Sequence, residues 1–318
     1  MTPTQLRAFA AVVRLGSVKS AAADLHVSEA AVSLHVGQLR KELGDKLFQR
    51  TGAGLAFTPG GLRLASRAAE LLGLQDRTIL EVRQAGDGRR LLRVAASSLF
   101  AEHAAPGLIG LFADRAKDLD VELSIHNPSH FETLLRTRAV DVVIGPRPPA
   151  GDTTLATTHF LNYQIIAVAH PAHPLAKAPP TASALRDQTW LLGPTGASRA
   201  DVVLAMLHRM NVPEDRQQIF QSHAAALQEA KRGKGIALVV SFAAAQDIAS
   251  GDLTRLTGNL LQAQGTWNIT MLGGGTAPSA AAELTRFITT PRATQAMLRG
   301  GGTTPGRFKP SIYVTLWN

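Results

Sequence analysis

Residues 16–33 read GSVKSAAADLHVSEAAVS, a stretch in which two helical segments stand on either side of a short turn. Ser17 and Ser28 each precede one segment, at the position where a hydroxyl can accept a hydrogen bond from a backbone N–H one turn into a helix. Only residues 25–27 separate the segments, so the helices must cross steeply, and the small side chains of residues 21–23 permit the close approach. The stretch therefore predicts a helix-turn-helix unit whose second helix is free to lie in a major groove of DNA.

Apolar residues at helical spacing extend this unit in both directions. They form three stripes in which each residue follows the last by three or four positions. The stripes are Leu6, Phe9 and Val13, then Val18, Ala22 and Leu25, then Val32, Val36, Leu39 and Leu43. We therefore predict three helices, each of which buries one face.

The helix that begins after Ser28 is the predicted recognition helix, and such a helix presents its first turn to the edges of the bases. Serine hydroxyls there can address a base or a phosphate. Glu29 is more specific, because a carboxylate in the groove can accept a hydrogen bond from cytosine N4. Its alternative role is electrostatic, since it also stands at the positive end of its own helix. The predicted DNA contacts from the two helices are Ser17, Lys19, Ser28, Glu29, Ala30, Ser33 and His35.

This pattern resembles the N-terminal winged helix-turn-helix domain of LysR-type transcriptional regulators. The matching residues stand in order and without gaps: Leu6-x-x-Phe9, Gly16-Ser17, Ala21-Ala22, Leu25, Ala31-Val32-Ser33, Leu39, Gly44, Leu47-Phe48-x-Arg50, Thr58 and Gly61. The resemblance implies a wing over residues 47–58, in which Arg50 contacts a phosphate of double-stranded DNA. Two positions depart from the family pattern, because Glu29 replaces a frequent glutamine and Arg40 replaces a frequent glutamate. The first departure suggests an altered operator preference.

A long helix is predicted to follow the wing. Thr58 can cap its start, and Pro59 occupies the first turn, where a missing N–H costs nothing. The helix continues to about residue 85, and residues 86–88 end it as a hinge. Its apolar stripe needs a partner, which we expect to be a second copy of the chain, because the linker helix of the family pairs in this way. The stripe comprises Leu62, Ala65, Ala69, Leu72, Ile79 and Val82. A homodimer or homotetramer with paired recognition helices would match an inverted repeat.

Composition sets outer limits on the class of protein. A chain of 318 residues with a formal net charge of +9 is long enough for two or three domains and favours an anionic partner such as nucleic acid. It contains no cysteine, which excludes disulfides and thiol-based redox sensing. The N-terminal segment lacks the pattern of an export signal, and no apolar run has the length of a membrane span. We expect a cytoplasmic, chromosome-associated protein without membrane contact.

From Leu91 onward, short apolar runs alternate with helical stretches, which predicts an α/β unit with a mainly parallel sheet. One helix is expected over about residues 103–114. A second unit of this kind spans about residues 164–264, and the apolar run at residues 267–272 returns the chain to the first. Two lobes joined by two crossovers resemble the periplasmic-binding-protein-like effector domain of the same regulators.

The predicted fold class is therefore α/β, with an N-terminal all-α winged helix-turn-helix, a long linker helix and a C-terminal two-lobed α/β effector domain. The DNA-binding domain comprises residues 1–58, the linker helix and hinge residues 59–88, and the effector domain residues 89–318. Lobe I takes about residues 89–163 and 265–318, and lobe II about residues 164–264. Residues 308–318 resemble a strand that docks on its own lobe or on a neighbouring molecule.

Two such lobes leave a cleft at the carboxyl ends of their strands, where ligands usually bind. Ser97 and Ser98 follow the first strand at a helix start, where hydroxyls and free N–H groups can hold an anion, and Arg147 can add a charge-assisted bond. The predicted contacts of a small polar or anionic effector are Ser97, Ser98, Arg147, Thr195, Ser198 and Ser222. The alternative is that the serines only cap helices.

No catalytic residue, cofactor or metal site is predicted. His170 and His173 lie in an Ala-His-Pro-Ala-His-Pro loop without a cysteine or a nearby carboxylate, which argues against zinc. The glycine-rich segments lack the lysine and serine of a phosphate-binding loop, and no serine stands in a nucleophile elbow. The chain is therefore not expected to be an enzyme.

Taken together, these patterns predict a LysR-type regulator that binds an imperfect inverted repeat near a promoter and whose effector changes the spacing of its DNA-binding heads. Two alternatives stay open. In the first, the chain is a solute-binding or enzymatic α/β protein, and the helix-turn-helix serves only for dimerisation. In the second, it is an architectural DNA-binding protein without a ligand, which a cleft filled by side chains would support.

Overall fold

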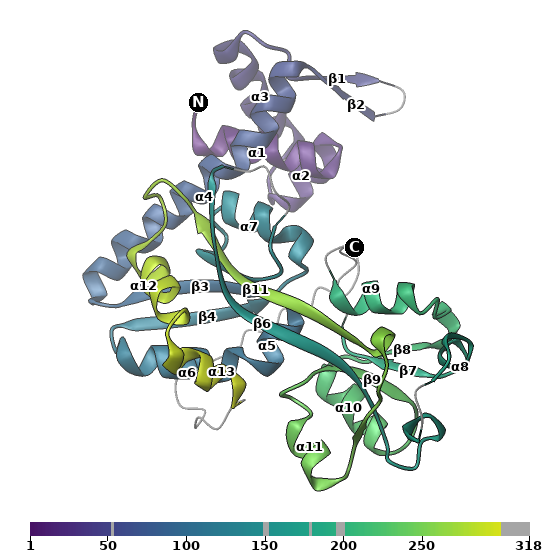
Figure 1. Ribbon diagram of the computed structural model, residues 1–318. Helices are drawn as coiled ribbons and strands as arrows, with labels where there is room; N and C mark the ends of the chain where they lie inside the picture. Colours follow the sequence, from purple (N-terminus) through teal and green to yellow (C-terminus); the bar gives the residue numbers. More distant parts are fainter. Residues whose placement is uncertain (52–53, 149–152, 178–179, 195–200, 300–318) are drawn as a thin grey trace. The chain divides into compact units, whose positions relative to one another are not determined.

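The computed structural model describes residues 1–51, 54–148, 153–177, 180–194 and 201–299 (Figure 1). This part of the chain divides near residue 88 into two compact units. The first unit is named the head here, and the second the C-terminal unit. The head comprises α1 (Pro3–Leu15), α2 (Val18–Asp24), α3 (Glu29–Leu43), β1 (Phe48–Thr51), β2 (Gly54–Phe57) and α4 (Pro59–Asp87).

Hydroxyl caps fix where the helices of the head begin. The side chains of Ser17, Ser28 and Thr58 each accept a hydrogen bond from the backbone N–H three residues further on, at the starts of α2, α3 and α4. This confirms the three predicted caps. Helices α1 and α3 end at Gly16 and Gly44, whose positive φ angles of 71° and 62° favour glycine.

The helices of the head pack around one apolar core. Phe9, Val12 and Leu39 are completely enclosed, and one face of α4 covers the same core through Ala68. Two details differ from the predicted stripes. The inward position in α1 belongs to Val12, so Val13 is only partly buried, and the last stripe residue of α3, Leu43, is exposed because it lies beyond the edge of the core.

The wing is an antiparallel hairpin of β1 and β2. Phe48 lies opposite Phe57 at its base, and Thr51 lies opposite Gly54 towards its tip. The ring of Phe48 contacts the rings of Phe57 and Phe9, with centroid separations of 5.9 and 6.2 Å. The base of the wing is therefore part of the core of the head.

The C-terminal unit is built on one sheet, whose strand order within the described residues is β4-β3-β5-β11-β6-β9-β7-β8, with β10 paired to β6. Its strands are β3 (Arg90–Ala96), β4 (Leu119–Ile125), β5 (Val142–Gly145), β6 (Leu155–Ala169), β7 (Trp190–Leu192), β8 (Gln217–Ile219), β9 (Ile236–Val240), β10 (Thr254–Arg255) and β11 (Gln262–Leu272). Its α-helices are α5 (Ser98–His103), α6 (Ala105–Arg115), α7 (Phe131–Arg136), α8 (Ala182–Arg186), α9 (Val202–Arg209), α10 (His223–Lys231), α11 (Ala245–Ser250), α12 (Ser279–Ile288) and α13 (Pro291–Leu298). Four short 3₁₀ helices lie at Pro128–His130, Pro174–Ala176, Glu214–Arg216 and Asn259–Leu261.

Two long strands, β6 and β11, run side by side through both lobes and join them (Figure 1). The shorter strands are parallel within each lobe, β3 with β4 and β5, and β7 with β8 and β9. The crossover strands pair with each other and with β5 and β9 in the antiparallel direction. The sheet is therefore mixed, and the prediction of a mainly parallel sheet is corrected, because apolar runs show where strands lie but not their direction.

The first helix of lobe I also starts earlier than predicted. Helical structure begins at Ser98 rather than near residue 103, and it is interrupted at Ala104, where the chain turns from α5 into α6. Pro106 lies in the first turn of α6, where proline interrupts no hydrogen bond.

A continuous apolar core passes from one lobe of the C-terminal unit to the other. It includes Leu108 and Ile144 in lobe I, Trp190 and Met206 in lobe II, and Trp267 on the crossover strand β11. None of the helices in the described ranges is both long and apolar enough to cross a membrane.

Candidate nucleic-acid interface and effector cleft

The outer face of α3 carries the central residues of the predicted DNA interface. Val36 and Leu39 are buried on its inner face, whereas Glu29, Ala30 and Ser33 are exposed in its first turn and a half. Ser28, the exposed residue before them, already accepts a hydrogen bond from the N-terminus of the helix through its hydroxyl. The first turn of α3 is thus free to meet base edges in a groove.

The other predicted contacts of the head differ in their surroundings. Lys19 is exposed on α2, and the half-buried Ser17 donates its hydroxyl proton to Ser20 Oγ at 2.8 Å. His35 is half-buried, and its Nδ1 has no hydrogen-bond partner among the described residues. Arg50 belongs to strand β1, but its side chain lies outside the described part of the structure.

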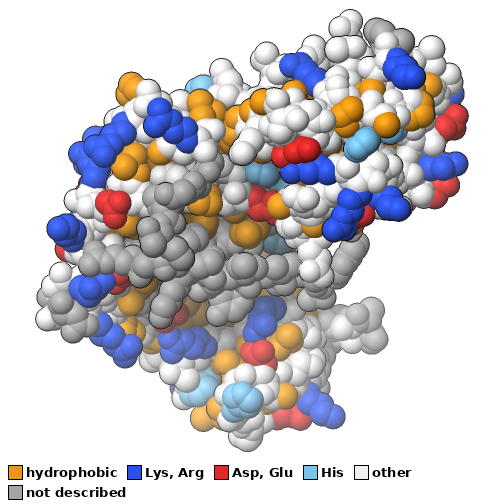
Figure 2. All heavy atoms as spheres, turned by 90° about the horizontal axis from the view of Figure 1, so that it is seen from below, with side chains coloured by type: hydrophobic (Ala, Val, Ile, Leu, Met, Phe, Trp, Pro, Cys, Tyr) orange, Lys and Arg blue, Asp and Glu red, His pale blue; other side chains and the backbone are white. Residues whose placement is uncertain are grey.

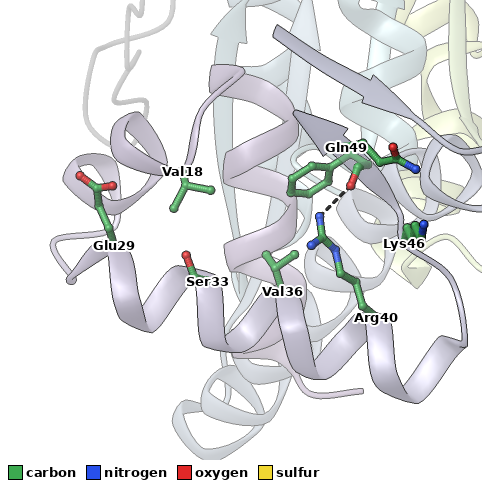
Figure 3. Close-up of a pocket in the computed structure, with 8 residues that line it drawn as sticks. Val18, Glu29, Ser33, Val36, Arg40, Lys46 and Gln49 are labelled. Carbon is green, nitrogen blue, oxygen red and sulfur yellow. Dashed lines mark hydrogen bonds between the residues drawn. The ribbon is translucent and has the colours of Figure 1, made fainter. Parts of the chain in front are cut away.

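A pocket of about 530 Å³ lies between α3, the start of α2 and strand β1 (Figure 3). It brings the predicted Glu29 and Ser33 together with three polar residues that the sequence analysis did not assign to DNA. Those residues are Arg40, Lys46 and Gln49. In the sequence, Lys46 and Gln49 stand on either side of residues 47–48, which match the family pattern. Their position beside the wing could therefore have indicated them as DNA contacts. Figure 3 shows Glu29 at one end of the pocket and the two cations at the other.

The base of the wing is held by a compact hydrogen-bond network. Asp45 Oδ1 accepts from the N–H of Leu47 and from the hydroxyl of Thr58, both at 2.6 Å, and these two bonds lower the pKa of the Asp45 carboxyl below its usual value. Leu47 has a positive φ of 60°, and its carbonyl accepts from the N–H of Thr58 at 3.0 Å. A Cβ at Gly61 would lie 1.8 Å from that carbonyl oxygen, so the site requires glycine.

Charges of both signs are distributed over the molecule. On the face of the molecule drawn in Figure 2, Lys and Arg side chains are scattered and Asp and Glu lie among them. Within the head, Arg14 pairs with Asp24 and Arg67 with Glu70, each at 2.6 Å. Exposed pairs of this kind contribute little to stability. The free face of α3 and the adjoining pocket define the candidate interface.

Two residues of the predicted effector site, Ser98 and Ser222, belong to α5 and to the cap of α10, which meet where the two lobes approach each other. Ser98 Oγ donates to the carbonyl oxygen of Pro194 at 2.9 Å and lies 3.4 Å from His223 Nε2. Ser222 caps α10, in agreement with the alternative role of these serines. Ser97 is buried and precedes α5, but its side chain forms no capping hydrogen bond.

The remaining predicted effector contacts are less informative. Arg147 is exposed and, within the described ranges, forms no hydrogen bond or ion pair. Thr195 and Ser198 lie outside the described residues.

Glu102 is the principal cleft residue that the sequence analysis missed. Its carboxylate extends from α5 of lobe I to the N-terminus of α10 in lobe II, where it accepts from the N–H of His223 at 2.8 Å and from that of Ala224 at 3.2 Å. Burial raises the pKa of the Glu102 carboxyl, although these N–H groups act in the opposite direction. The start of α10 already holds an anion that belongs to the chain itself. No local sequence signal could reveal a contact between residues so far apart.

Two histidines lie beside this contact in uncharged form. His223 is only 4% exposed, and burial lowers its pKa to about 3. Burial also lowers the pKa of His103 to about 4, and the two ring centroids are 5.6 Å apart. Neither His103 Nε2 nor His223 Nδ1 has a hydrogen-bond partner among the described residues. Both imidazoles are therefore neutral at neutral pH.

Aromatic side chains occupy the space over the crossover strands. The ring of Trp267 is enclosed by Tyr163 at 4.5 Å, Phe100 at 5.1 Å and Phe242 at 6.2 Å between centroids, and Phe100 also meets Phe160. Burial raises the pKa of the Tyr163 hydroxyl well above its usual range, so it remains protonated. These rings are therefore part of the apolar core that passes from one lobe to the other.

The fold and the free α3 face together define a winged helix-turn-helix protein with a two-lobed α/β domain. Residues 3–62 match the family model of the bacterial regulatory helix-turn-helix proteins of the LysR family, and residues 85–290 match that of the LysR substrate-binding domain. The chain belongs to the LysR family of transcriptional regulators. It is accordingly a DNA-binding regulator with an effector-binding domain and not an enzyme.

Proteins of related sequence agree with the assignment to this family. An HTH-type transcriptional regulator of Mycobacterium tuberculosis strain H37Rv, which is itself uncharacterized, is 54% identical over the whole of both chains. The RuBisCO operon transcriptional regulator of Allochromatium vinosum is 33% identical over 174 residues, which cover 54% of this chain and 57% of that one.

Solved structures show the same fold at lower identity. ArgP from Mycobacterium tuberculosis aligns with a TM-score of 0.59 and 22% identity, over 91% of this chain and 96% of the other. CbnR, a LysR family transcriptional regulator, aligns with a TM-score of 0.57 and 19% identity, over 93% of this chain and 99% of the other. At such identities the likeness concerns the fold and not the ligand.

Proposed function

We propose that this chain acts as a homodimer or homotetramer that binds an imperfect inverted repeat near a promoter, in the cytoplasm and on the chromosome. The observation that carries the proposal is the exposed first turn of α3, on which Glu29, Ala30 and Ser33 point away from the buried side of the helix. Recognition helices place this turn against base edges. The remaining predicted contacts of the head, Arg50 in the wing among them, would hold the DNA backbone.

The exposed side of α4 supports self-association. Five large apolar side chains remain open to solvent along this helix, in addition to the residues that pack on the head. They are Leu62, Leu71, Leu74, Ile79 and Val82. The predicted stripe is thus divided, since Ala65 and Leu72 pack against the core of the head while Leu62, Ile79 and Val82 are left uncovered. With about 3.6 residues per helical turn, Leu71, Leu74, Ile79 and Val82 share one side of α4, whereas Leu62 lies on the opposite side. A second copy of α4 would bury these four side chains, and two-fold symmetry would present two recognition helices to an inverted repeat.

The C-terminal unit is proposed to bind a small polar or anionic effector between its lobes, through the predicted serines, Thr195 and Arg147. The position of Ser98 on α5 and of Ser222 at the start of α10, two elements that meet at this junction, supports a polar ligand there. Such an effector would act by stabilising one of two quaternary arrangements that differ in the spacing of the heads, which requires that it bind one arrangement more tightly than the other.

A second candidate is a regulator that works without an effector. Two observations favour it: Glu102 already occupies the start of α10, and aromatic rings surround Trp267. The two candidates differ in one respect that can be measured: a small molecule alters DNA binding in the first and does not in the second.

The test of the DNA-binding proposal is a gel shift of the full chain on the DNA upstream of its own gene, with random DNA as competitor. Ser33→Glu places a negative charge on the proposed reading face and should abolish specific retention. Ser183→Glu adds the same charge at an exposed position of α8, in the C-terminal unit, and should leave retention intact. Equal, salt-sensitive retention of every DNA by all three proteins would contradict the specific operator.

A further inference from the structure

Arg40 joins the recognition helix to the wing. It lies near the C-terminal end of α3, and its Nη2 donates to the carbonyl oxygen of Phe48, the first residue of β1, at 2.7 Å (Figure 3). Its guanidinium carbon also lies 4.5 Å from the centre of the Phe48 ring. The side chain thus contacts both the backbone and the ring of the residue at which the wing begins.

No other contact of this kind holds β1 to α3 among the described residues. The network of Asp45, Leu47 and Thr58 fixes the turn before the strand and the start of α4, but it does not reach α3. The carbonyl of Phe48 can only accept a hydrogen bond, so its partner must be a donor. The glutamate that is frequent in the family at position 40 has no proton to give when ionised, whereas arginine does.

We propose that Arg40 is a positioning residue that fixes β1 against α3 and thereby sets where Arg50, two residues further along the strand, meets a DNA phosphate. This inference rests on the proposed function in one point, the phosphate contact of Arg50. Arg40 acts through the wing: its Nη2 is bonded to Phe48, and its Nε is buried without a hydrogen-bond partner among the described residues.

A double-mutant cycle on the full chain tests this role. Wild type, Arg40→Met, Arg50→Ala and the double variant are titrated onto a random duplex of about 30 bp over a series of salt concentrations, because phosphate contacts do not depend on sequence. Methionine keeps an apolar stem over Phe48 but cannot donate. We expect each single substitution to lower affinity about tenfold and to reduce the salt slope by about one per protomer. The double variant should again lose only about tenfold, since Arg50 is no longer held in place.

Lys41→Met is the matched control. Lys41 is exposed on the same turn of α3 and has no part in the contact between Arg40 and Phe48, which is called the tether here. Removal of the Lys41 charge should therefore leave the full effect of Arg50→Ala in place. Arg40→Lys is the second variant of the tether, because an ammonium group keeps a donor for the Phe48 carbonyl. In the Arg40→Lys background, Arg50→Ala should again lower the affinity for DNA by close to tenfold. A change at position 40 that only destabilised the protein would not restore this effect. Circular dichroism at the temperature of the titration verifies that each variant is folded.

Three results would overturn the inference. A loss of about a hundredfold in the double variant would mean that Arg40 and Arg50 contact DNA independently. Unchanged affinity of Arg40→Met would mean that the tether has no influence on binding. If Arg50→Ala by itself leaves affinity and salt slope unchanged, the proposed wing contact is wrong, and that single arm separates its failure from a failure of the tether.

Discussion

Acid should destabilise the C-terminal unit through His223. This imidazole is 4% exposed, and its ring is packed so closely against Gly193 that a Cβ there would lie 2.1 Å from Nδ1. Burial lowers its pKa to about 3, and the neighbouring His103 adds to this effect. Protonation in the folded state would place a charge in a site that offers no partner to Nδ1 within the described residues.

The sign and size of the effect follow from the pKa values. A histidine whose pKa is depressed by folding contributes stability that is complete above its unfolded value of about 6.5 and is lost as the pH falls towards the folded value. Between about pH 7.5 and about pH 5.5, this loss is on the order of 1 kcal/mol for His223. Any folded pKa below about 4.5 gives the same figure, so the prediction does not depend on the exact value. His103, whose pKa is lowered to about 4, causes a further loss of stability of similar size in the wild type over the same pH range.

Urea unfolding followed by tryptophan emission measures this loss. Trp190 and Trp267 are completely buried in the C-terminal unit and so report on its unfolding. We compare wild type, His223→Asn and His208→Asn, an exposed histidine of α9, at both pH values. The wild type and His208→Asn should each lose on the order of 1 kcal/mol more than His223→Asn over this range.

Equal losses in all three proteins would refute the reasoning. Other titrating groups do not interfere, because they are common to the three proteins and cancel in the comparison. Glu102 is one of them: its raised pKa means that protonation in the acid range favours the folded state, which opposes the histidine effect equally in each protein.

Four further substitutions concern single positions. Gly61→Ala, whose new Cβ would clash with the carbonyl of Leu47, should lower the stability of the head by about 1–3 kcal/mol in thermal unfolding followed by circular dichroism. Gly37→Ala meets no atom within 4 Å and should instead stabilise α3 by up to about 1 kcal/mol, so equal effects of the two would contradict the structure. Val82→Glu, at a side chain that is 69% exposed on α4, should shift sedimentation towards a smaller species, and an unchanged profile would place the dimer interface elsewhere. Glu102→Ala leaves two backbone N–H groups at the start of α10 without their acceptor and should destabilise the C-terminal unit by about 1–3 kcal/mol in urea, whereas unchanged stability would deny the contact a structural role.

Local structure was largely predictable from the sequence. The caps at Ser17, Ser28 and Thr58 each involve a bond to a residue three positions away, so the residues that form them stand together in the chain. The assignment of the inward face was less exact, since Val12 rather than Val13 enters the core of α1. The two neighbouring valines have the same hydropathy, so the sequence pattern does not distinguish them. The packing of the other helices determines which of the two is buried.

The direction of the crossover strands was not predictable in the same way. β6 and β11 read as apolar segments, but their antiparallel pairing depends on the path of the chain between them, nearly a hundred residues long. The pattern that revealed parallel strands inside each lobe therefore gave the wrong expectation for the strands that join the lobes.

The sequence by itself determined the helix-turn-helix, the long helix after it, the alternation of strands and helices in the C-terminal unit, and, through its motifs, the family. These features depend on caps and periodicity that act over a few residues. Only the tertiary structure decided that Arg40 holds Phe48, that Glu102 occupies the start of α10 and that His223 is buried beside it. Such contacts join elements that the chain brings together only when its apolar faces pack, and no local pattern of residues specifies which polar side chains will then be neighbours.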